Sequence, residues 1–297
     1  MKRPDYSAHE HLLIGLRARP ELWRMGAGLL VAVAVMFALM ILTQGILASR
    51  APTLLDGMSG DAAGNTPASL LVMLGSYGFA SLGVMAAGLM IYHRGAARLL
   101  GGWQRCWRQF RRAMTGLLIL YAVSYLLPPW SMGAPLEPNL SLSLWLTLLP
   151  LSILAVLVQV SAEEIVFRGY LQQTLAARFS NPLIWMVVPT ILFALGHYMP
   201  AQAGENAILI AVWAGFFGLA AADLTARSGT LGPAIALHLA NNVSALLLVS
   251  MQGSLSGLSL YLAPFSMADA TDLRPWLIVD LFGMLCAWLA VRLALRV

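Results

Sequence analysis

The chain has 297 residues, of which 59% are hydrophobic and only 10% are charged, and its mean hydropathy is +0.76. Soluble domains carry about 25% charged residues, so this composition excludes an ordinary soluble protein and indicates a polytopic membrane protein. The formal net charge of +5 is therefore no sign of nucleic-acid binding, and no nucleic-acid partner is predicted. The only two cysteines are Cys106 and Cys286, which argues against a disulfide framework or a thiolate metal site.

Eight apolar stretches are long enough, or nearly so, to cross a bilayer as helices of about 20 residues. They are Met25–Ala48, Ser69–Tyr92, Thr115–Trp130, Leu140–Val160, Leu183–Tyr198, Asn206–Ala222, Leu231–Met251 and Pro275–Leu293. The segments between them, such as 51–67 and 251–274, are rich in loop-forming residues. Neither a repeat nor a linker divides the chain, so we predict one all-α membrane domain, residues 1–297, with about eight transmembrane helices.

Basic residues are distributed unequally between the two sets of loops. An even number of spans puts both termini on the same side of the membrane. If that side is the cytoplasm, sixteen Lys and Arg residues lie inside and only two, Arg50 and Arg274, lie outside, as the positive-inside rule requires. We therefore predict cytoplasmic termini, and the arginine-rich composition favours a bacterial cytoplasmic (inner) membrane. The basic segment 93–112 fits either an amphipathic helix on the inner leaflet of the lipid bilayer or a solvated loop.

A cluster of charges directly follows the fourth apolar stretch, in the sequence Ser161–Tyr170 (SAEEIVFRGY). A charge at the centre of a bilayer costs at least about 2.5–3.5 kcal/mol, so its presence needs a physical reason. On a helix, Glu164 and Arg168 are four residues apart with the acid first, which is the better orientation for an ion pair. Glu163 is rotated by about 100°, so its carboxylate can point elsewhere. One acid is then neutralised while the other is free for chemistry.

Two later stretches add polar side chains at helical spacing. Phe193 and His197 are one turn apart near the end of the fifth stretch. His238 and Asn242 share one face of the seventh stretch, with Asn241 close by. Taken alone, each is more simply explained as an interhelical hydrogen-bond partner, and the double glutamate as part of a structural ion pair.

Together these side chains form a set that peptide hydrolysis can use. The reaction needs a base that deprotonates water and donors that stabilise the oxyanion of the tetrahedral intermediate. Glu163 and His197 could hold and activate the water. His238 and Asn242 could donate hydrogen bonds to the oxyanion, and the low dielectric constant of the site would strengthen all of these contacts.

At these residues the sequence resembles the CPBP intramembrane proteases, the family of CAAX prenyl proteases and bacteriocin-processing enzymes that is also called Abi. The motifs are Glu163-Glu164-x-x-x-Arg168, Phe193-x-x-x-His197 and His238-x-x-x-Asn242, in the family's order and within residues 140–251. The resemblance implies an intramembrane endopeptidase with its catalytic core in that region. It implies that Glu163 activates the water with help from His197. It also implies that His238 and Asn242 stabilise the oxyanion. Glu164 and Arg168 would support the site.

The resemblance also bears on cofactors and partners. Glu163, His197 and His238 could form a three-ligand zinc site with an open position. The sequence lacks an H-E-x-x-H pattern, however, and a His238 engaged with the oxyanion would not be free to bind metal. We therefore expect no cofactor. The expected partner is a membrane-associated peptide or protein substrate, such as a bacteriocin leader or a regulatory membrane protein, and the sequence leaves the oligomeric state open.

Two other functions fit the same polar residues. A secondary transporter could relay protons through Glu163, Glu164 and the histidines, although no inverted repeat is visible. A non-catalytic membrane scaffold or immunity protein could keep the fold without the reaction, although the intact motifs argue against it. Asp280, alone in the last apolar stretch, is more simply explained by a packing contact or a hydrogen bond than by a function.

The predicted depths of the polar residues disagree. If the fourth stretch runs inward, Glu163 lies at its inner end, whereas His197 lies near the outer end of the fifth stretch. Either proline kinks shift these helices, or the fourth helix starts later and continues past Tyr170. A water-filled cavity open to the cytoplasm would accommodate polar groups at this depth.

Overall fold

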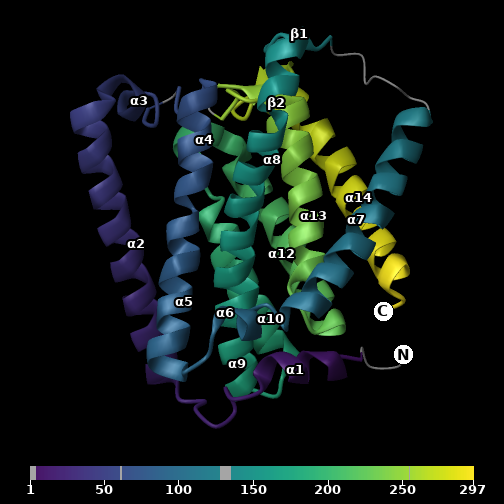
Figure 1. Ribbon diagram of the computed structural model, residues 1–297. Coiled ribbons are helices and arrows are strands. Elements are labelled where there is room, and N and C mark those ends of the chain that lie inside the picture. The colour runs from purple at the N-terminus through teal and green to yellow at the C-terminus, as the bar shows by residue number, and fades with distance from the viewer. Residues whose placement is uncertain (1–4, 61, 128–134, 254) are drawn as a thin grey trace.

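The computed structural model describes residues 5–60, 62–127, 135–253 and 255–297, and these fold mainly into helices (Figure 1). Both ends of the chain lie at one end of a helical bundle, and a small β-sheet lies at the opposite end. Trp130, the predicted end of the third apolar stretch, lies outside the described residues.

Each of the eight apolar stretches falls mainly on a helix or a run of helices, but the end of the seventh, residues 249–251, belongs to a strand. The helices are α2 (Leu22–Arg50), α4 (Pro67–Ser76) with α5 (Gly78–Tyr92), α7 (Trp103–Leu126), α8 (Leu142–Glu164), α10 (Pro182–Gly196), α12 (Ala207–Ser228), α13 (Gly232–Val243) and α14 (Ala270–Leu295). In the described part of the chain, five runs are long and apolar enough to cross a membrane, namely 22–50, 67–92, 142–178, 200–228 and 270–295. Two further apolar runs, 182–196 and 232–248, are shorter. The protein is therefore a mostly helical, multi-pass membrane protein.

Short elements complete the chain. They are η1 (Ser7–His9), α1 (Glu10–Leu13), α3 (Pro52–Asp56), α6 (Ala96–Leu99), η2 (Ile165–Gln172), α9 (Gln173–Arg178), α11 (Pro200–Ala203), η3 (Gly204–Asn206) and η4 (Ser244–Leu248). Two of them, η2 and η4, are wide π-helical turns that directly follow the polar ends of α8 and α13. Such turns occur frequently at functional sites.

The fourth helix does not end at Val160. α8 continues without a break through η2 (8 residues) and α9 (6 residues), which carries the helix about 21 Å beyond Glu164. After a short turn, the 15 residues of α10 return by about 22 Å. His197, at the end of α10, therefore comes back to the level of the two glutamates. This continuation past Tyr170 removes the disagreement in depth, and the helix starts only two residues later than predicted, at Leu142.

The basic segment after α5 is mostly part of a long helix. α7 begins at Trp103, so residues 103–112 continue directly into the third apolar stretch, and Trp103 and Trp107 are exposed on this first part of the helix. Gly101, with φ at +83°, makes the turn before it. A side chain at Gly101 would collide with the backbone of Gly229, so the glycine allows the turn to pack against the start of α13.

A three-stranded sheet at the other end of the bundle was not predicted. Its order is β1 (Glu137–Pro138), β3 (Tyr261–Ser266) and β2 (Val249–Gln252). β1 pairs antiparallel with β3, and β2 pairs parallel with it. The segment 251–274, which the sequence predicts as a loop, thus folds back over the ends of the helices and closes one end of a cavity between them.

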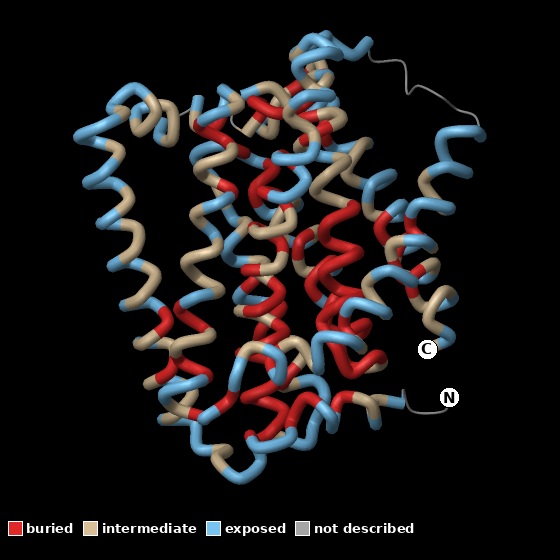
Figure 2. Tube along the Cα trace, in the orientation of Figure 1, coloured by how far each residue is buried: buried red, intermediate tan, exposed pale blue. Residues whose placement is uncertain are grey.

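Burial is concentrated in the middle of the bundle (Figure 2). The inner halves of α12 and α13 consist almost entirely of buried residues, as does most of η2 and α9. In contrast, α2 presents most of its apolar residues outward, as Leu30 and Ile41 illustrate, which is the pattern of a helix that faces lipid. The charged motif on α8 and η2 is therefore held by the most tightly packed part of the protein.

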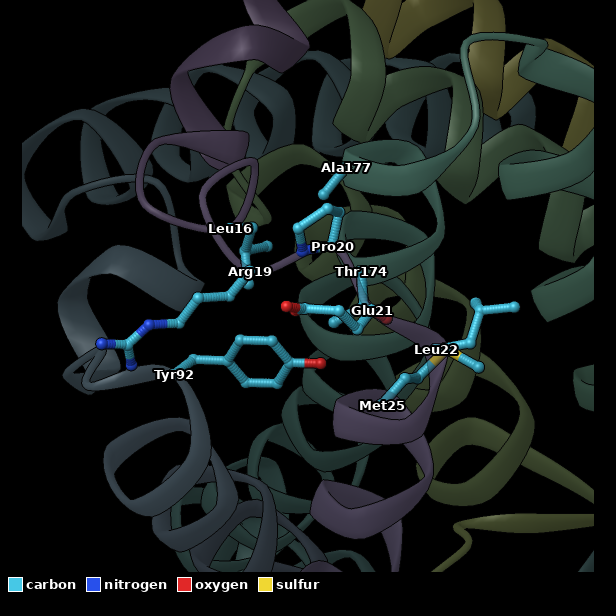
Figure 3. Close-up of a pocket in the computed structure, with 9 residues that line it drawn as sticks. All are labelled: Leu16, Arg19, Pro20, Glu21, Leu22, Met25, Tyr92, Thr174 and Ala177. Atoms are coloured by element: carbon cyan, nitrogen blue, oxygen red, sulfur yellow. The ribbon is translucent and has the colours of Figure 1, made fainter.

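The N-terminal segment closes the inner end of the bundle. His9 is buried and stacks on Trp185 of α10 at 4.7 Å between ring centroids. The Tyr6 hydroxyl donates a 3.0 Å hydrogen bond to Asp223 of α12. Beside this segment, a pocket lies between the start of α2, the end of α5 and α9 (Figure 3), but it has no internal space for a water molecule.

Candidate active site

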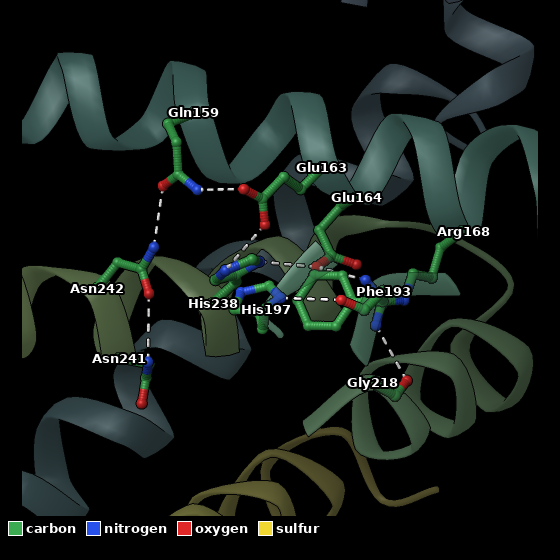
Figure 4. A network of polar contacts seen from close by, with 10 residues as sticks. All are labelled: Gln159, Glu163, Glu164, Arg168, Phe193, His197, Gly218, His238, Asn241 and Asn242. Carbon is green, nitrogen blue, oxygen red and sulfur yellow. Dashed lines mark hydrogen bonds and ion pairs between the residues drawn. The ribbon is translucent and has the colours of Figure 1, made fainter. Parts of the chain in front are cut away.

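The predicted ion pair on the fourth helix is present and fully buried. Arg168 Nη1 donates a 3.0 Å hydrogen bond to Glu164 Oε1, with side-chain exposures of only 2% and 0%. Arg168 Nη2 donates to the carbonyl of Gly218 on α12 at 3.0 Å, and the guanidinium lies 4.8 Å from the ring centroid of Phe193 on α10. The arginine thus ties three helices together at the site (Figure 4).

Glu163 points in a different direction, as the helical rotation predicts. Its Oε1 accepts a 2.6 Å hydrogen bond from Gln159, one turn earlier on α8. Its Oε2 lies 3.6 Å from His238 Nε2 and has no hydrogen-bond partner among the described residues. One oxygen of Glu163 is therefore held in place by a hydrogen bond, while the other is buried and faces an imidazole without a hydrogen bond of its own.

His238 lies between the two acids. Its Nδ1 is 2.8 Å from Glu164 Oε1, and its Nε2 faces Glu163 Oε2. Because an ionised Glu164 can only accept hydrogen bonds, Nδ1 is the protonated nitrogen in this contact. The prediction that only Glu163 would be free and Glu164 tied down by Arg168 is thus too simple, since Glu164 also orients the imidazole.

Asn242 joins the same network through a residue that the sequence did not single out. Asn242 Nδ2 donates to Gln159 Oε1 at 2.9 Å, and Gln159 donates in turn to Glu163. Asn241 donates to Asn242 Oδ1 at 3.2 Å. A glutamine one turn before Glu163 in a largely apolar helix is the sequence signal that could have indicated this bridge.

His197 reaches the site from the end of α10. Its Nδ1 is 2.9 Å from the carbonyl of Phe193, and the two rings are 4.5 Å apart between centroids. Phe193 also packs against the His238 ring at 6.1 Å, so the two imidazoles flank one aromatic side chain. Figure 4 shows His197 among the residues of this cluster, and no direct hydrogen bond links it to Glu163.

A cavity of about 530 Å³ adjoins this cluster. His197, Asn241 and Asn242 form part of its wall, and most of the rest comes from α7, α12, η4, α14, β2 and β3. The sequence-based expectation was a site that opens towards the predicted cytoplasmic side. The cavity instead extends from the polar cluster towards the sheet, which is the end of the bundle away from the termini.

The zinc alternative finds no support in the arrangement of side chains. Across residues 5–60, 62–127, 135–253 and 255–297, no three His, Cys, Asp or Glu side chains form a group that could hold a metal ion. His238 Nδ1 is engaged by Glu164, and His197 Nδ1 by a backbone carbonyl. We therefore derive no step of the chemistry through a metal.

These features define a class of protein: a multi-pass helical membrane protein with a buried cluster of two glutamates, an arginine, histidines and carboxamides beside an internal cavity. Comparison with known proteins narrows the class. Residues 145–244 match the family described as type II CAAX prenyl endopeptidase Rce1-like, in agreement with the resemblance of the motifs. All residues of the polar cluster lie within the matched segment.

A curated relative matches over a similar extent. The chain is 30% identical over 125 residues to the uncharacterized protein YyaK of Bacillus subtilis (strain 168), and the match covers 41% of this chain and 40% of that protein. The chain thus spans less than half the length of this relative. No solved structure matches the chain.

Proposed function

We propose that this protein is an intramembrane endopeptidase that hydrolyses a peptide bond with water activated by Glu163. The observation that supports this most strongly is Glu163 Oε2, which faces His238 Nε2 at 3.6 Å and has no hydrogen-bond partner in the described residues. A carboxylate oxygen that is oriented but has no hydrogen bond, in a cluster whose His197 and Asn242 line a cavity, is suited to bind the nucleophilic water. The match to a family of prenyl endopeptidases supports the same reaction.

In the first step, Glu163 takes a proton from water and the hydroxide attacks the carbonyl carbon of the peptide bond. Gln159 fixes the carboxylate through Oε1, which leaves Oε2 for the water. His197, on the wall of the cavity, assists by orienting the same water. A general base of this kind contributes about 10²–10⁴-fold to the rate.

His238 and Asn242 then stabilise the negative charge on the carbonyl oxygen. With Nδ1–H donated to Glu164, His238 can donate from Nε2 only as an imidazolium. In that form the cluster is electrically balanced, since Arg168 and the imidazolium offset the two glutamates. Asn242 uses one N–H for Gln159 and has a second N–H for the substrate. Finally the C–N bond breaks, and Glu163 returns its proton to the leaving amine.

The proposal also includes the membrane topology, the location, the substrate and the cofactor requirement of the protein. Eight membrane crossings with both termini in the cytoplasm agree with the distribution of basic residues, and a bacterial inner membrane is the proposed location. The proposed substrate is a membrane-associated peptide or protein. No metal or other cofactor takes part in the proposed reaction.

Replacement of Glu163 tests the proposal. Glu163→Gln keeps the volume and the contact with Gln159 but removes the base, so we expect cleavage of a fluorogenic membrane peptide in detergent to fall by about 10²–10⁴-fold. The matched control is Glu205→Gln, which removes an exposed acid at the far end of the bundle. Full activity of Glu163→Gln would contradict the proposal, and uptake of protons or solutes into proteoliposomes without peptide products would favour a transporter.

A further inference from the structure

The cavity beside the polar cluster is large enough to bind part of a substrate. Its volume of about 530 Å³ lies within the range of about 300–1,000 Å³ that is typical of ligand pockets. Most of its wall is apolar or aromatic, with Trp213, Phe265 and Trp276 among the lining residues. His197 and Asn242 form one side of it, so a peptide that reaches the proposed catalytic residues would also occupy this space.

One side chain of the wall carries a charge. Asp280 lies near the middle of α14, is exposed and lines the cavity. Among the described residues its carboxylate makes no hydrogen bond and no ion pair, in contrast to the acids of the catalytic cluster. A charge in the middle of a membrane-spanning helix costs at least about 2.5–3.5 kcal/mol, so an unpaired carboxylate at this position calls for a partner that the described residues do not supply.

Two further groups of the same wall also have no partner in the described part of the chain. They are Trp213 Nε1 on α12 and Ser250 Oγ on β2, both buried. An unsatisfied buried donor costs about 1–3 kcal/mol. Within an apolar lining, the cavity thus contains a carboxylate that can pair with a cation. It also contains two hydrogen-bond donors, Trp213 Nε1 and Ser250 Oγ, that can bind carbonyl oxygens.

We propose that this cavity binds the substrate beside its scissile bond and selects an apolar peptide that carries a cationic group, which pairs with Asp280. The cation is a lysine or arginine side chain or a free α-amine. This inference rests on the proposed function, because it names the class of substrate for the same site. A peptide also supplies carbonyl oxygens for Trp213 and Ser250, which the acyl chain of a lipid does not.

The sheet gives a second reason to expect that the substrate binds as an extended peptide. β2 is an edge strand that pairs only with β3 in the described structure, and Val249, Ser250 and Met251 of this strand line the cavity. Edge strands bind extended peptides by backbone hydrogen bonds. A substrate aligned along β2 would lie in the cavity that Asp280, His197 and Asn242 also line.

Binding rather than cleavage tests this inference. The probes are fluorescent apolar peptides that differ only in one residue, Lys, Gln or Glu, placed at each position in turn. They are titrated by fluorescence polarisation against Glu163→Gln protein in detergent, so that no turnover occurs. At the best position we expect the Lys peptide to bind about tenfold more tightly than the Gln peptide, equivalent to about 1.4 kcal/mol, and the Glu peptide to bind most weakly.

Variants of Asp280 give the decisive comparison. In the Glu163→Gln background, Asp280→Asn should reduce the preference for Lys over Gln to within about twofold, while Asp280→Glu should retain it. Asp272→Asn is the matched control, because Asp272 lies exposed in the first turn of the same helix and does not line the cavity. If Asp280→Asn fails to fold, Asp280→Ser replaces it.

The inference is overturned if the Lys peptide has no advantage at any position, or if the advantage survives the loss of the Asp280 carboxylate. The two proposals fail in different ways. If the Lys preference depends on Asp280 but the unaltered protein cleaves none of the peptides, the endopeptidase proposal is wrong and the binding site stands.

Discussion

Two acid–arginine pairs with the same spacing occur in this protein, and they differ in what surrounds them. Glu164 and Arg168 are joined at 3.0 Å in the buried part of the bundle, and Asp223 and Arg227 at 2.8 Å near the C-terminal end of α12. Both acids precede their arginine by four residues. Sequence spacing alone therefore predicts both pairs but does not distinguish their roles.

The hydrogen bonds of the carboxylate oxygens distinguish the two pairs. Asp223 Oδ1 accepts from Tyr6 and Arg227, and Oδ2 accepts from Trp288 at 3.0 Å. Near the other pair, Glu163 Oε2 and Glu164 Oε2 are buried and lack hydrogen-bond partners in the described residues. The Asp223 cluster is satisfied by its own chain, as expected of a structural element. Each glutamate has one oxygen held by hydrogen bonds and one buried oxygen without a hydrogen bond, as expected of a reactive site.

The comparison predicts opposite outcomes for two amide substitutions. Glu163→Gln should reduce cleavage by about 10²–10⁴-fold and leave the melting temperature close to that of the unaltered protein. Asp223→Asn should keep at least about half of the activity but reduce stability by about 1–3 kcal/mol, because it weakens hydrogen bonds to Tyr6, Arg227 and Trp288. Paired activity and thermal-unfolding assays check this, and equal effects of both variants on activity would break the distinction.

Removal of one partner of the buried Glu164–Arg168 ion pair should destabilise the protein. Arg168→Met leaves Glu164 without its arginine, and removal of one partner of a buried pair destabilises a protein by about 3–5 kcal/mol. The double variant Glu164→Gln/Arg168→Met should recover much of that stability while remaining inactive, since the Glu164 carboxylate also orients His238. Thermal unfolding in detergent measures both. A stable single variant would show that the arginine is not needed for the fold.

The inner end of the bundle should respond to pH. Burial lowers the pKa of His9 from 6.5 to about 4, so the folded protein binds this proton less tightly than the unfolded chain. The contribution of the docked N-terminal segment to the free energy of unfolding is therefore fully present above about pH 6.5 and decreases as the pH falls towards 4. At pH 5 the decrease is about 2 kcal/mol. Hydrogen exchange of this segment measures the change. His9→Phe keeps an aromatic ring against Trp185 and should abolish the pH dependence between 7 and 5.

Gln159 should affect the reaction more than the fold. Gln159→Leu removes both the hydrogen bond to Glu163 and the one from Asn242, so the carboxylate loses its orientation. We expect kcat to fall about tenfold, equivalent to about 1.4 kcal/mol, with KM changed by less than about twofold. Leucine suits the apolar helix, so a merely structural role of Gln159 would leave kcat unchanged.

Metal chelators should have the smallest effect. Because the described residues contain no three-ligand group, incubation with a strong chelator followed by desalting should leave the rate within about 20% of its initial value. The control is a zinc protease treated in parallel. Loss of activity that is restored by zinc would contradict the metal-free reaction.

The parts of the site that could be predicted are those fixed within one helix. The spacing of Glu164 and Arg168 predicts their contact, and the rotation of Glu163 predicts its different direction. The end of the fourth helix could not be predicted from hydropathy, because residues 161–178 are polar for a membrane span and yet are buried by α10 and α12. His238 between two acids and Gln159 as a bridge to Asn242 depend on how separate helices pack. The short strands carry too few residues for a clear pattern, so the sheet and the cavity beneath it emerge only in three dimensions.

The most direct test of the account is a structure of the Glu163→Gln variant with an uncleaved apolar peptide that carries one lysine. We predict a peptide carbonyl oxygen within about 3 Å of His238 Nε2 and Asn242 Nδ2, with residue 163 positioned beside the carbonyl carbon and the lysine directed to Asp280. A peptide bound elsewhere on the protein, or in the cavity with no carbonyl near His238 and Asn242, would contradict it.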